Sequence, residues 1–525
     1  MRLTLSIFFK NSKIFRIFLE GAMKQSGFLF LAMVFVLFLC ACGGSSGEKA
    51  DNDIQPDSDN VGPVVPDADD TEPDDTAADD SDDPAADEPD DDASPDSETS
   101  DDVQTGGIYI FSDFEGEVST AEILGHGGFF GFTLLPLNER YWGVSALHES
   151  FPSYDFNNAT GALHIFEKGA PVNSIDDAKF VLTHPDMLLQ AGFGMSFAAC
   201  DINGDGFDDI VVSAHLAENN GLYASGQVIA FYGDESGWSS ENSSVSTLSS
   251  AYQQKADSLG QSLACLDYDG DGFDDVFAGG QNAGPELHGG GSPGMAAHFA
   301  GSPEGLSEHE TWVLLPELSE KMQYFGSNMA KSDINGDGRP DLLIGGWGLK
   351  SDSYASNGGG IYIYLSGSDW QSGADVKLYG VEGSQFGTAL KVVEIAGQKY
   401  IGTVAPSEGE RGTVHLFPTS DIEHRVDIQL DQLPELGDSP ASDFDIVKIS
   451  DGREMIVIGG KYFAGGGALV CAEFGEDGFA APQLCPWQPE EASGGFGYSV
   501  SNLGDIDGSG KESLVVGKPE YIHSF

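Results

Sequence analysis

Basic residues are scarce in this chain of 525 residues. It has 24 Lys plus Arg against 85 Asp plus Glu, a formal net charge of −61 at pH 7. A nucleic-acid-binding protein needs a basic footprint, and electrostatic attachment to an anionic membrane needs basic residues as well. The composition therefore excludes nucleic acid as a partner and requires any membrane attachment to come from something other than charge.

The chain also lacks a specific catalytic constellation. It contains no His-Glu-x-x-His motif and no phosphate-binding Gly-rich loop ending in Gly-Lys-Ser/Thr. Carboxylates are so abundant that a proposed acid/base pair would prove nothing. The histidines His126, His148, His215 and His288 are scattered, and we expect solvated or capping side chains. We predict a protein that is not an enzyme, with a carbohydrate-active enzyme (glycosidase or polysaccharide lyase) as the alternative.

Only six cysteines are present. Cys471 and Cys485 flank a turn and could form a disulfide in an oxidising compartment. Cys200 and Cys265 each stand just before an Asp-rich loop. We expect these two to be buried thiols, because free cysteine is among the most buried residue types.

Long apolar runs are missing except near the N-terminus. A short basic start at Met23, the plausible true start, leads to an apolar run over residues 28–39 and then to Cys42. This run is shorter than the ~20 residues of a spanning helix, so residues 1–41 predict a secretory signal. The sequence Leu39-Cys40-Ala41-Cys42 resembles a bacterial lipoprotein processing site, which implies lipidation at Cys42 and residence at the outer membrane or cell surface.

Residues 42–105 follow as a predicted disordered acidic linker. Residues 48–105 contain 24 acidic residues and one Lys. Such a tract cannot bury enough apolar surface to fold, and its charges repel one another. We interpret it as an extended spacer between the lipid anchor and a domain over residues 106–525.

Three stretches of that domain nearly repeat one another: residues 201–209, 267–275 and 333–341. Each places oxygen side chains at positions 1, 3, 5 and 9, glycine at position 6 and an inward carbonyl at position 7, a pattern that suits Ca²⁺. A weaker fourth copy at residues 505–513 has serine at positions 5 and 9. The predicted calcium ligands are Asp201, Asn203, Asp205, Phe207 and Asp209; Asp267, Asp269, Asp271, Phe273 and Asp275; Asp333, Asn335, Asp337, Arg339 and Asp341; and, more weakly, Asp505, Asp507, Ser509, Lys511 and Ser513.

An EF-hand is the obvious alternative, but it requires a Glu at position 12 and a following helix. Position 12 is Val212, Ala278 and Ile344, each inside an apolar run. The loops therefore join strands. We expect calcium to rigidify each hairpin and not to bridge a ligand, because the protein oxygens occupy most coordination sites.

Each loop belongs to a longer repeat of about 55 to 66 residues. A Phe-Gly or related pair precedes the loop, as at Phe193-Gly194 and Phe325-Gly326, and an alternating aromatic strand follows it. Seven copies are present if the strand beginning at Gly107 completes the last one. We predict an all-β, seven-bladed β-propeller of four-stranded blades, closed by the N-terminal strand, which leaves no unprotected sheet edge.

The Phe-Gly pairs, the Asp-rich loops and the Gly-Gly or Ala exits resemble FG-GAP repeats, as in the β-propeller of integrin α chains. The resemblance covers roughly residues 106–525. It implies a calcium-stabilised propeller that is commonly extracellular and commonly a binding module, and it implies no specific ligand.

Long connections between the second and third strands of the first four blades should lie on the face opposite the calcium loops. Such loops on a rigid scaffold often carry function. We predict that this face binds a protein or a glycan at the cell surface; a purely structural envelope protein is a further alternative. Candidate contact residues are Tyr154, Tyr223, His288, Trp347 and Tyr354.

Overall fold

The structure, a computed structural model, describes residues 106–112, 114, 119–125, 128–149, 159–285, 292–316, 322–350, 358–436, 440–449, 452–461, 466–489 and 495–519. The predicted signal region, the start at Met23, the lipidation site Cys42 and the linker 42–105 lie outside these residues. Among the described residues, no helix is long and apolar enough to cross a membrane.

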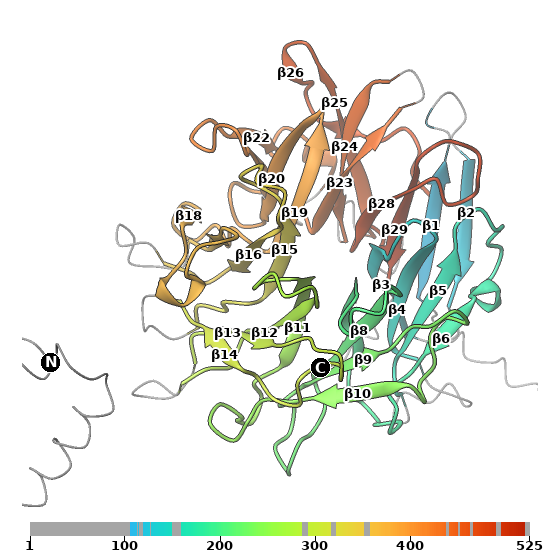
Figure 1. Ribbon diagram of the computed structural model, residues 1–525. Coiled ribbons are helices and arrows are strands. Elements are labelled where there is room, and N and C mark those ends of the chain that lie inside the picture. The colour runs from blue at the N-terminus through green and yellow to red at the C-terminus, as the bar shows by residue number, and fades with distance from the viewer. Residues whose placement is uncertain are drawn as a thin grey trace, which may run out of the picture. The chain divides into compact units, whose positions relative to one another are not determined.

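Seven antiparallel sheets form a ring (Figure 1), which confirms the predicted seven-bladed β-propeller. Strands one to four of each blade follow one another outward in the sheet, and the sixth blade carries a fifth strand. Blade by blade, the strands are β3 (Gly128–Pro136), β4 (Tyr141–His148), β5 (Ala162–Glu167) and β6 (Phe180–Leu182); β7 (Phe193–Cys200), β8 (Asp209–Ala214), β9 (Gln227–Phe231) and β10 (Ser243–Ser246); β11 (Leu259–Leu266), β12 (Asp275–Gly280), β13 (Met295–Phe299) and β14 (Trp312–Leu314); β15 (Asn328–Ser332), β16 (Asp341–Gly346), β17 (Gly360–Tyr364) and β18 (Val376–Tyr379); β19 (Ala389–Ile395), β20 (Gln398–Ala405), β21 (Thr413–Pro418) and β22 (Val426–Gln429); β23 (Asp443–Lys448), β24 (Glu454–Gly460), β25 (Ala468–Gly475), β26 (Gly478–Phe479) and β27 (Gln483–Leu484); and β28 (Val500–Gly504), β29 (Ser513–Lys518), β1 (Gly107–Ser112) and β2 (Ser119–Leu124).

The last blade combines both ends of the described chain. Strand β1 pairs with β29 in antiparallel register, Gly107 opposite Lys518, and β2 pairs with β1 on the outside. The sequence pattern pointed to one N-terminal strand, whereas the sheet contains two. The sequence of β2 gives little indication of a strand, because Ile123 is its one fully buried residue among those whose burial is described.

The Phe-Gly pairs join neighbouring blades. The leading side chain, as in Phe193 or Phe325, is fully buried between blades. Its backbone also forms an isolated parallel bridge to the preceding blade, as between Gly294 and Phe325. The following glycine has a positive φ, +84° at Gly326, and a Cβ there would stand 2.4 Å from the carbonyl oxygen of Met295. Glycine is thus required by backbone conformation and by the closeness of the next blade.

We expect Gly326→Ala to lower the free energy of unfolding by about 2 kcal/mol, because it adds a steric clash to the strain of a left-handed backbone. Gly383→Ala is the matched control: its φ is +80°, but nothing lies within 4 Å of the added Cβ. Urea unfolding of both variants measures the difference. Equal losses would show that the blade contact at Gly326 contributes nothing.

Side-chain hydrogen bonds link successive blades around the ring axis, through the first strands or the residues just before them. Each of the seven blade boundaries has at least one such bond, and at the boundary between β19 and β23 it is an ion pair. The bonds run, from donor to acceptor, from Thr133 to Met195, Leu263 to Ser196, Ser262 to Gly326, Asn328 to Gly387, Lys391 to Asp443, Ser442 to Gly497 and Ser499 to Gly131. The ring is therefore closed by polar contacts on the inside as well as by apolar packing between blades.

Two disulfides are present among the described residues. One joins Cys200 on β7 to Cys265 on β11, so the prediction of buried thiols is wrong for both. Both side chains are buried as predicted, but the strands of neighbouring blades bring them together, with Cα atoms 5.8 Å apart. The other joins Cys471 to Cys485 within the sixth blade.

Candidate metal centre and crossover face

The Asp-rich loops connect the first and second strands of blades two, three, four and seven and share one hydrogen-bond pattern. In loop 201–209 the carboxylate of Asp201 accepts hydrogen bonds from the backbone N–H groups of Asp205 (3.1 Å) and Gly206 (3.1 Å). Loops 267–275 and 333–341 repeat both contacts. The glycines at positions 4 and 6 have positive φ in all four loops. The sequence thus folds each loop so that side chains at positions 1, 3 and 5 turn inward.

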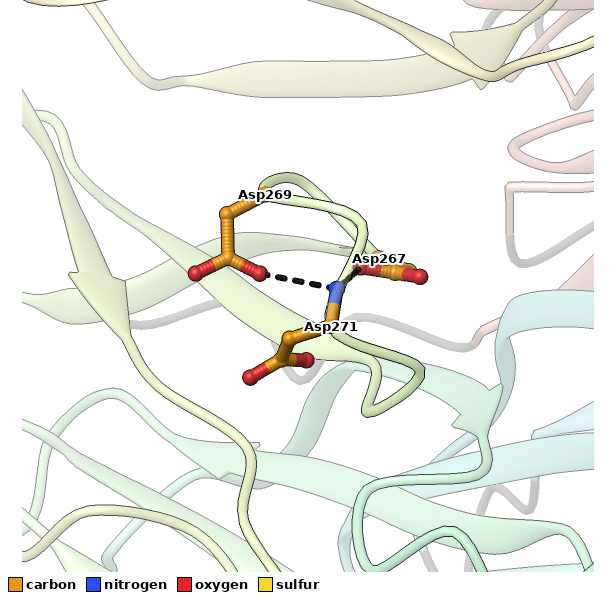
Figure 2. Close-up of side chains that lie close together, drawn as sticks. All are labelled: Asp267, Asp269 and Asp271. Carbon is orange, nitrogen blue, oxygen red and sulfur yellow. Dashed lines mark hydrogen bonds between the residues drawn. The ribbon is translucent and has the colours of Figure 1, made fainter.

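Three carboxylates come closest together in loop 267–275 (Figure 2). One oxygen from each of Asp267, Asp269 and Asp271 lies within 4.8 Å of the others. Burial raises the pKa of Asp269, and the neighbouring carboxylates raise it further. Three acidic oxygen donors at this spacing, with no nitrogen or sulfur donor, match the all-oxygen shell that calcium prefers. The residues therefore fit the predicted ion by their chemistry.

The position-9 aspartates occupy a different environment, because they are buried. Asp209 accepts hydrogen bonds from Ile202 N (3.0 Å) and from Gly233 N (2.9 Å) at the end of the third strand. Asp275 and Asp341 make the equivalent pairs of contacts. Burial raises the pKa of Asp209 to about 6. These carboxylates tie the loop to its own blade.

The fourth loop, residues 505–513, repeats this turn but lacks the buried aspartate at position 9. Gly510 N donates to Asp505 (2.8 Å) and Ser509 N donates to Asp507 (2.9 Å), as in the other loops. Position 9 is Ser513, whose hydroxyl lies 3.2 Å from that of Ser112 on β1. This loop offers fewer anionic oxygens than the other three, in line with the weaker site predicted from its sequence.

The position-7 side chains contact the neighbouring loop. The ring of Phe273 lies against Gly204, where a Cβ would approach it to 2.7 Å. The guanidinium of Arg339 donates to the carbonyl oxygen of Tyr268 (3.1 Å). Phe207 is exposed. The sequence reasoning considered only the position-7 carbonyls and missed these contacts between blades.

We call the opposite side of the propeller the crossover face. It carries the connections from second to third strands and those from one blade to the next. Two of the predicted contact residues can be placed on it: Tyr223 is 58% exposed, and Trp347 stacks on Tyr324 with ring centroids 3.6 Å apart. Tyr154, His288 and Tyr354 lie outside the described residues.

Most of the exposed apolar side chains lie on the crossover face. Nine large hydrophobic residues are exposed among the described residues, and seven of them lie in these connections or at the strand ends that lead into them. The seven are Leu124, Met187, Leu189, Tyr223, Leu315, Met322 and Val381. The other two are Val181 on an outer strand and Phe207 in an Asp-rich loop. Because seven of the nine lie on one face of the ring, this face is the candidate interaction surface.

Two histidines lie on the same face, at the ends of the second strands of blades one and two. Burial lowers the pKa of His148 and that of His215 to about 4, and His148 contributes to the lowering at His215. His215 Nδ1 lies 3.3 Å from the carbonyl oxygen of Gly192. Both side chains are half-buried, so neither is the fully solvated histidine that was one of the two expectations from the sequence.

We expect acid to destabilise the propeller through these histidines. Their folded pKa of about 4 lies below the ordinary value of 6.5, so the unfolded chain takes up their protons first. Their contribution is fully present above pH 6.5 and is lost as pH falls toward 4, at up to about 1.4 kcal/mol per pH unit for each histidine. Urea unfolding of His148→Asn/His215→Asn against the wild type, from pH 7 to 4.5, measures it.

The comparison with the wild type is needed because Asp257 acts in the opposite direction. Burial raises the pKa of Asp257 to about 7, so its protonation stabilises the fold across much of the same range. Asp257 is unchanged in the variant, and its effect cancels. An identical pH slope in the variant and the wild type would contradict the prediction.

The comparisons with known proteins agree with this geometry. Residues 193–231 match the FG-GAP repeat. The propeller is integrin-like. A stretch of 166 residues is 30% identical to integrin alpha-5 of Xenopus laevis, covering 30% of this chain and 15% of that protein. A longer stretch of 263 residues is 25% identical to integrin alpha-4 of Xenopus laevis, covering 46% of this chain and 22% of that protein.

A further relative is an enzyme by name. Over 202 residues the chain is 26% identical to phosphatidylinositol-glycan-specific phospholipase D of Bos taurus, covering 37% of this chain and 22% of that protein. The chain thus spans less than a quarter of each of these relatives. The similarity to each of them is confined to a segment.

Proposed function

We propose that this protein is a lipid-anchored, calcium-binding propeller at the bacterial outer membrane or cell surface, and that its crossover face binds a protein or a glycan. The exposed apolar residues on that face carry the proposal. A rigid ring holds these side chains out on connecting segments, which is how binding loops are commonly presented. The likeness to integrin α propellers supports a binding role, and the likeness to a phospholipase D involves only part of that enzyme.

Calcium supports this role through the scaffold. The donor oxygens of Asp267, Asp269 and Asp271 fit the ion, and the same loop fold recurs at residues 201–209 and 333–341. All of these loops lie on the face opposite the crossover connections, because strand direction alternates within each blade. Calcium would therefore stabilise the blades and would not contact the partner.

The test measures binding of the purified chain to a glycan array and to whole cells. We expect Tyr223→Asp/Met322→Asp to weaken any saturable binding at least about tenfold, since a charge replaces an apolar contact. Val181→Asp is the matched control, because Val181 is exposed to a similar extent but lies on the outer strand β6. Equal binding by both variants, or no saturable binding by the wild type, would overturn the proposed role of this face.

The lipid anchor has its own test. Cys42→Ser should remove metabolic labelling by palmitate and release the protein from the membrane fraction. Cys40→Ser is the neighbouring control and should change neither. Persistent membrane association of the Cys42 variant would show that another segment provides attachment.

A further inference from the structure

The Asp-rich loops of blades two and three are joined to each other by more contacts than those of blades three and four. Asp201, at position 1 of its loop, donates its backbone N–H to the carboxylate of Asp274 in the next loop (3.1 Å). Asp274 returns a hydrogen bond from its own backbone N–H to the carbonyl oxygen of Asp201 (3.0 Å). The two residues thus form a reciprocal pair across the blade boundary.

A covalent bond reinforces this boundary. Cys200 directly precedes Asp201, and Cys265 lies two residues before Asp267, so the Cys200–Cys265 disulfide links the strands that lead into both loops. The contact of Phe273 with Gly204 lies between the same two loops. By contrast, loop 333–341 contacts the loop before it through one side chain, Arg339, whose guanidinium donates to the carbonyl oxygen of Tyr268 and lies near Gly270.

We propose that loops 201–209 and 267–275 bind calcium as one coupled pair, with Asp274 as the positioning residue and the Cys200–Cys265 disulfide holding the two loops in register. The inference rests on the proposed calcium role. Asp201 supplies ligands from its side chain while Asp274 fixes its backbone, so ordering of either loop restrains the other. Ordering by a first ligand makes a second one bind more tightly, and the coupling is reciprocal.

The test uses the full chain with the other two loops silenced by Asp337→Ala and Asp507→Ala. Adding Asp271→Ala leaves loop 201–209 alone, and adding Asp205→Ala in its place leaves loop 267–275 alone. Calcium titration calorimetry, with stoichiometry from native mass spectrometry, gives each affinity with and without the partner loop. We expect each loop to bind about fivefold more weakly alone.

Asp274→Ala in the two-loop protein should bring both affinities to their single-loop values. Asp208→Ala is the matched control: Asp208 holds the same position in its loop, but its carboxylate accepts from the side chain of Asn138 (2.7 Å) in a hairpin without an Asp-rich loop. Equal affinities with and without the partner loop would overturn the coupling and leave the calcium role intact. A folded two-loop protein that binds no calcium would overturn both.

A second measurement needs no substitution. Calcium should slow the reduction of Cys200–Cys265 by a phosphine reductant at least about tenfold more than that of Cys471–Cys485, because ordering the loop pair suppresses local opening around the first disulfide. Trapping the freed thiols and reading their masses gives both rates in one sample. Equal slowing of both disulfides, or slowing of neither, would overturn the inference.

Discussion

Removing calcium is expected to lower the free energy of unfolding of this propeller by about 2 to 5 kcal/mol. A ligand that binds only the folded chain stabilises it by RT ln(1 + [L]/Kd). Extracellular calcium modules bind with Kd of about 10⁻⁴ to 10⁻³ M, so three loops at about 2 mM calcium give this range. Urea unfolding in calcium and in EGTA measures it.

The stabilisation by calcium should come from loops 201–209, 267–275 and 333–341. Asp205→Ala/Asp271→Ala/Asp337→Ala removes the position-5 carboxylate from each and should make stability independent of calcium. Asp507→Ala, in the loop that lacks a carboxylate at position 9, should retain nearly the whole calcium effect. Replacing calcium with magnesium is a further control, because magnesium demands a stricter octahedral shell. Equal stability of the wild type in calcium and in EGTA would contradict the prediction.

The blades and their loops could be predicted because their signals are local. Nine consecutive residues determine the turn of loop 267–275, and its glycines, its backbone hydrogen bonds and its inward carboxylates all follow from that segment. Phe-Gly pairs mark where five of the seven blades begin, because the ring packs between blades and the next backbone lies too close for a side chain after it. Repetition then gave the number of blades.

Contacts between blades could not be predicted in the same way. The pairing of Cys200 with Cys265 depends on how two first strands are staggered across a boundary, and their sequences do not specify that stagger. The contact between Asp201 and Asp274 has the same origin. Isolated exposed residues such as Met322 and Leu189 also carry no sequence signal, because only the closed ring places them on the same face.

The strongest example of an unpredicted contact between blades is the ion pair of Lys391, which joins blades five, six and seven. Lys391 on β19 lies 3.0 Å from one carboxylate oxygen of Asp443 and 3.8 Å from a carboxylate oxygen of Asp445, both on β23. It also donates to the carbonyl oxygen of Val500 on β28. The two carboxylates accept backbone N–H groups of β28, from Val500 (2.8 Å) and Asn502 (3.0 Å). One ammonium group thus holds three first strands together.

Lys391→Met should therefore lower the free energy of unfolding by about 3 kcal/mol. The substitution keeps most of the stem's volume but leaves two largely buried carboxylates without their cation, and breaking a buried pair from one side costs about 3–5 kcal/mol. Burial already raises the pKa of Asp445, and Lys391 opposes that rise. Urea unfolding at pH 7 measures the loss.

Two further variants identify the cause of this loss of stability. Lys391→Met/Asp443→Asn/Asp445→Asn removes the charges while keeping oxygens that can accept from Val500 and Asn502, so stability should return to within about 1 kcal/mol of the wild type. Lys179→Met breaks an exposed pair with Glu167 (3.6 Å) and should cost less than about 0.5 kcal/mol. If the triple variant is as unstable as Lys391→Met, the loss comes from packing of the lysine stem and not from unpaired charge at the blade boundary.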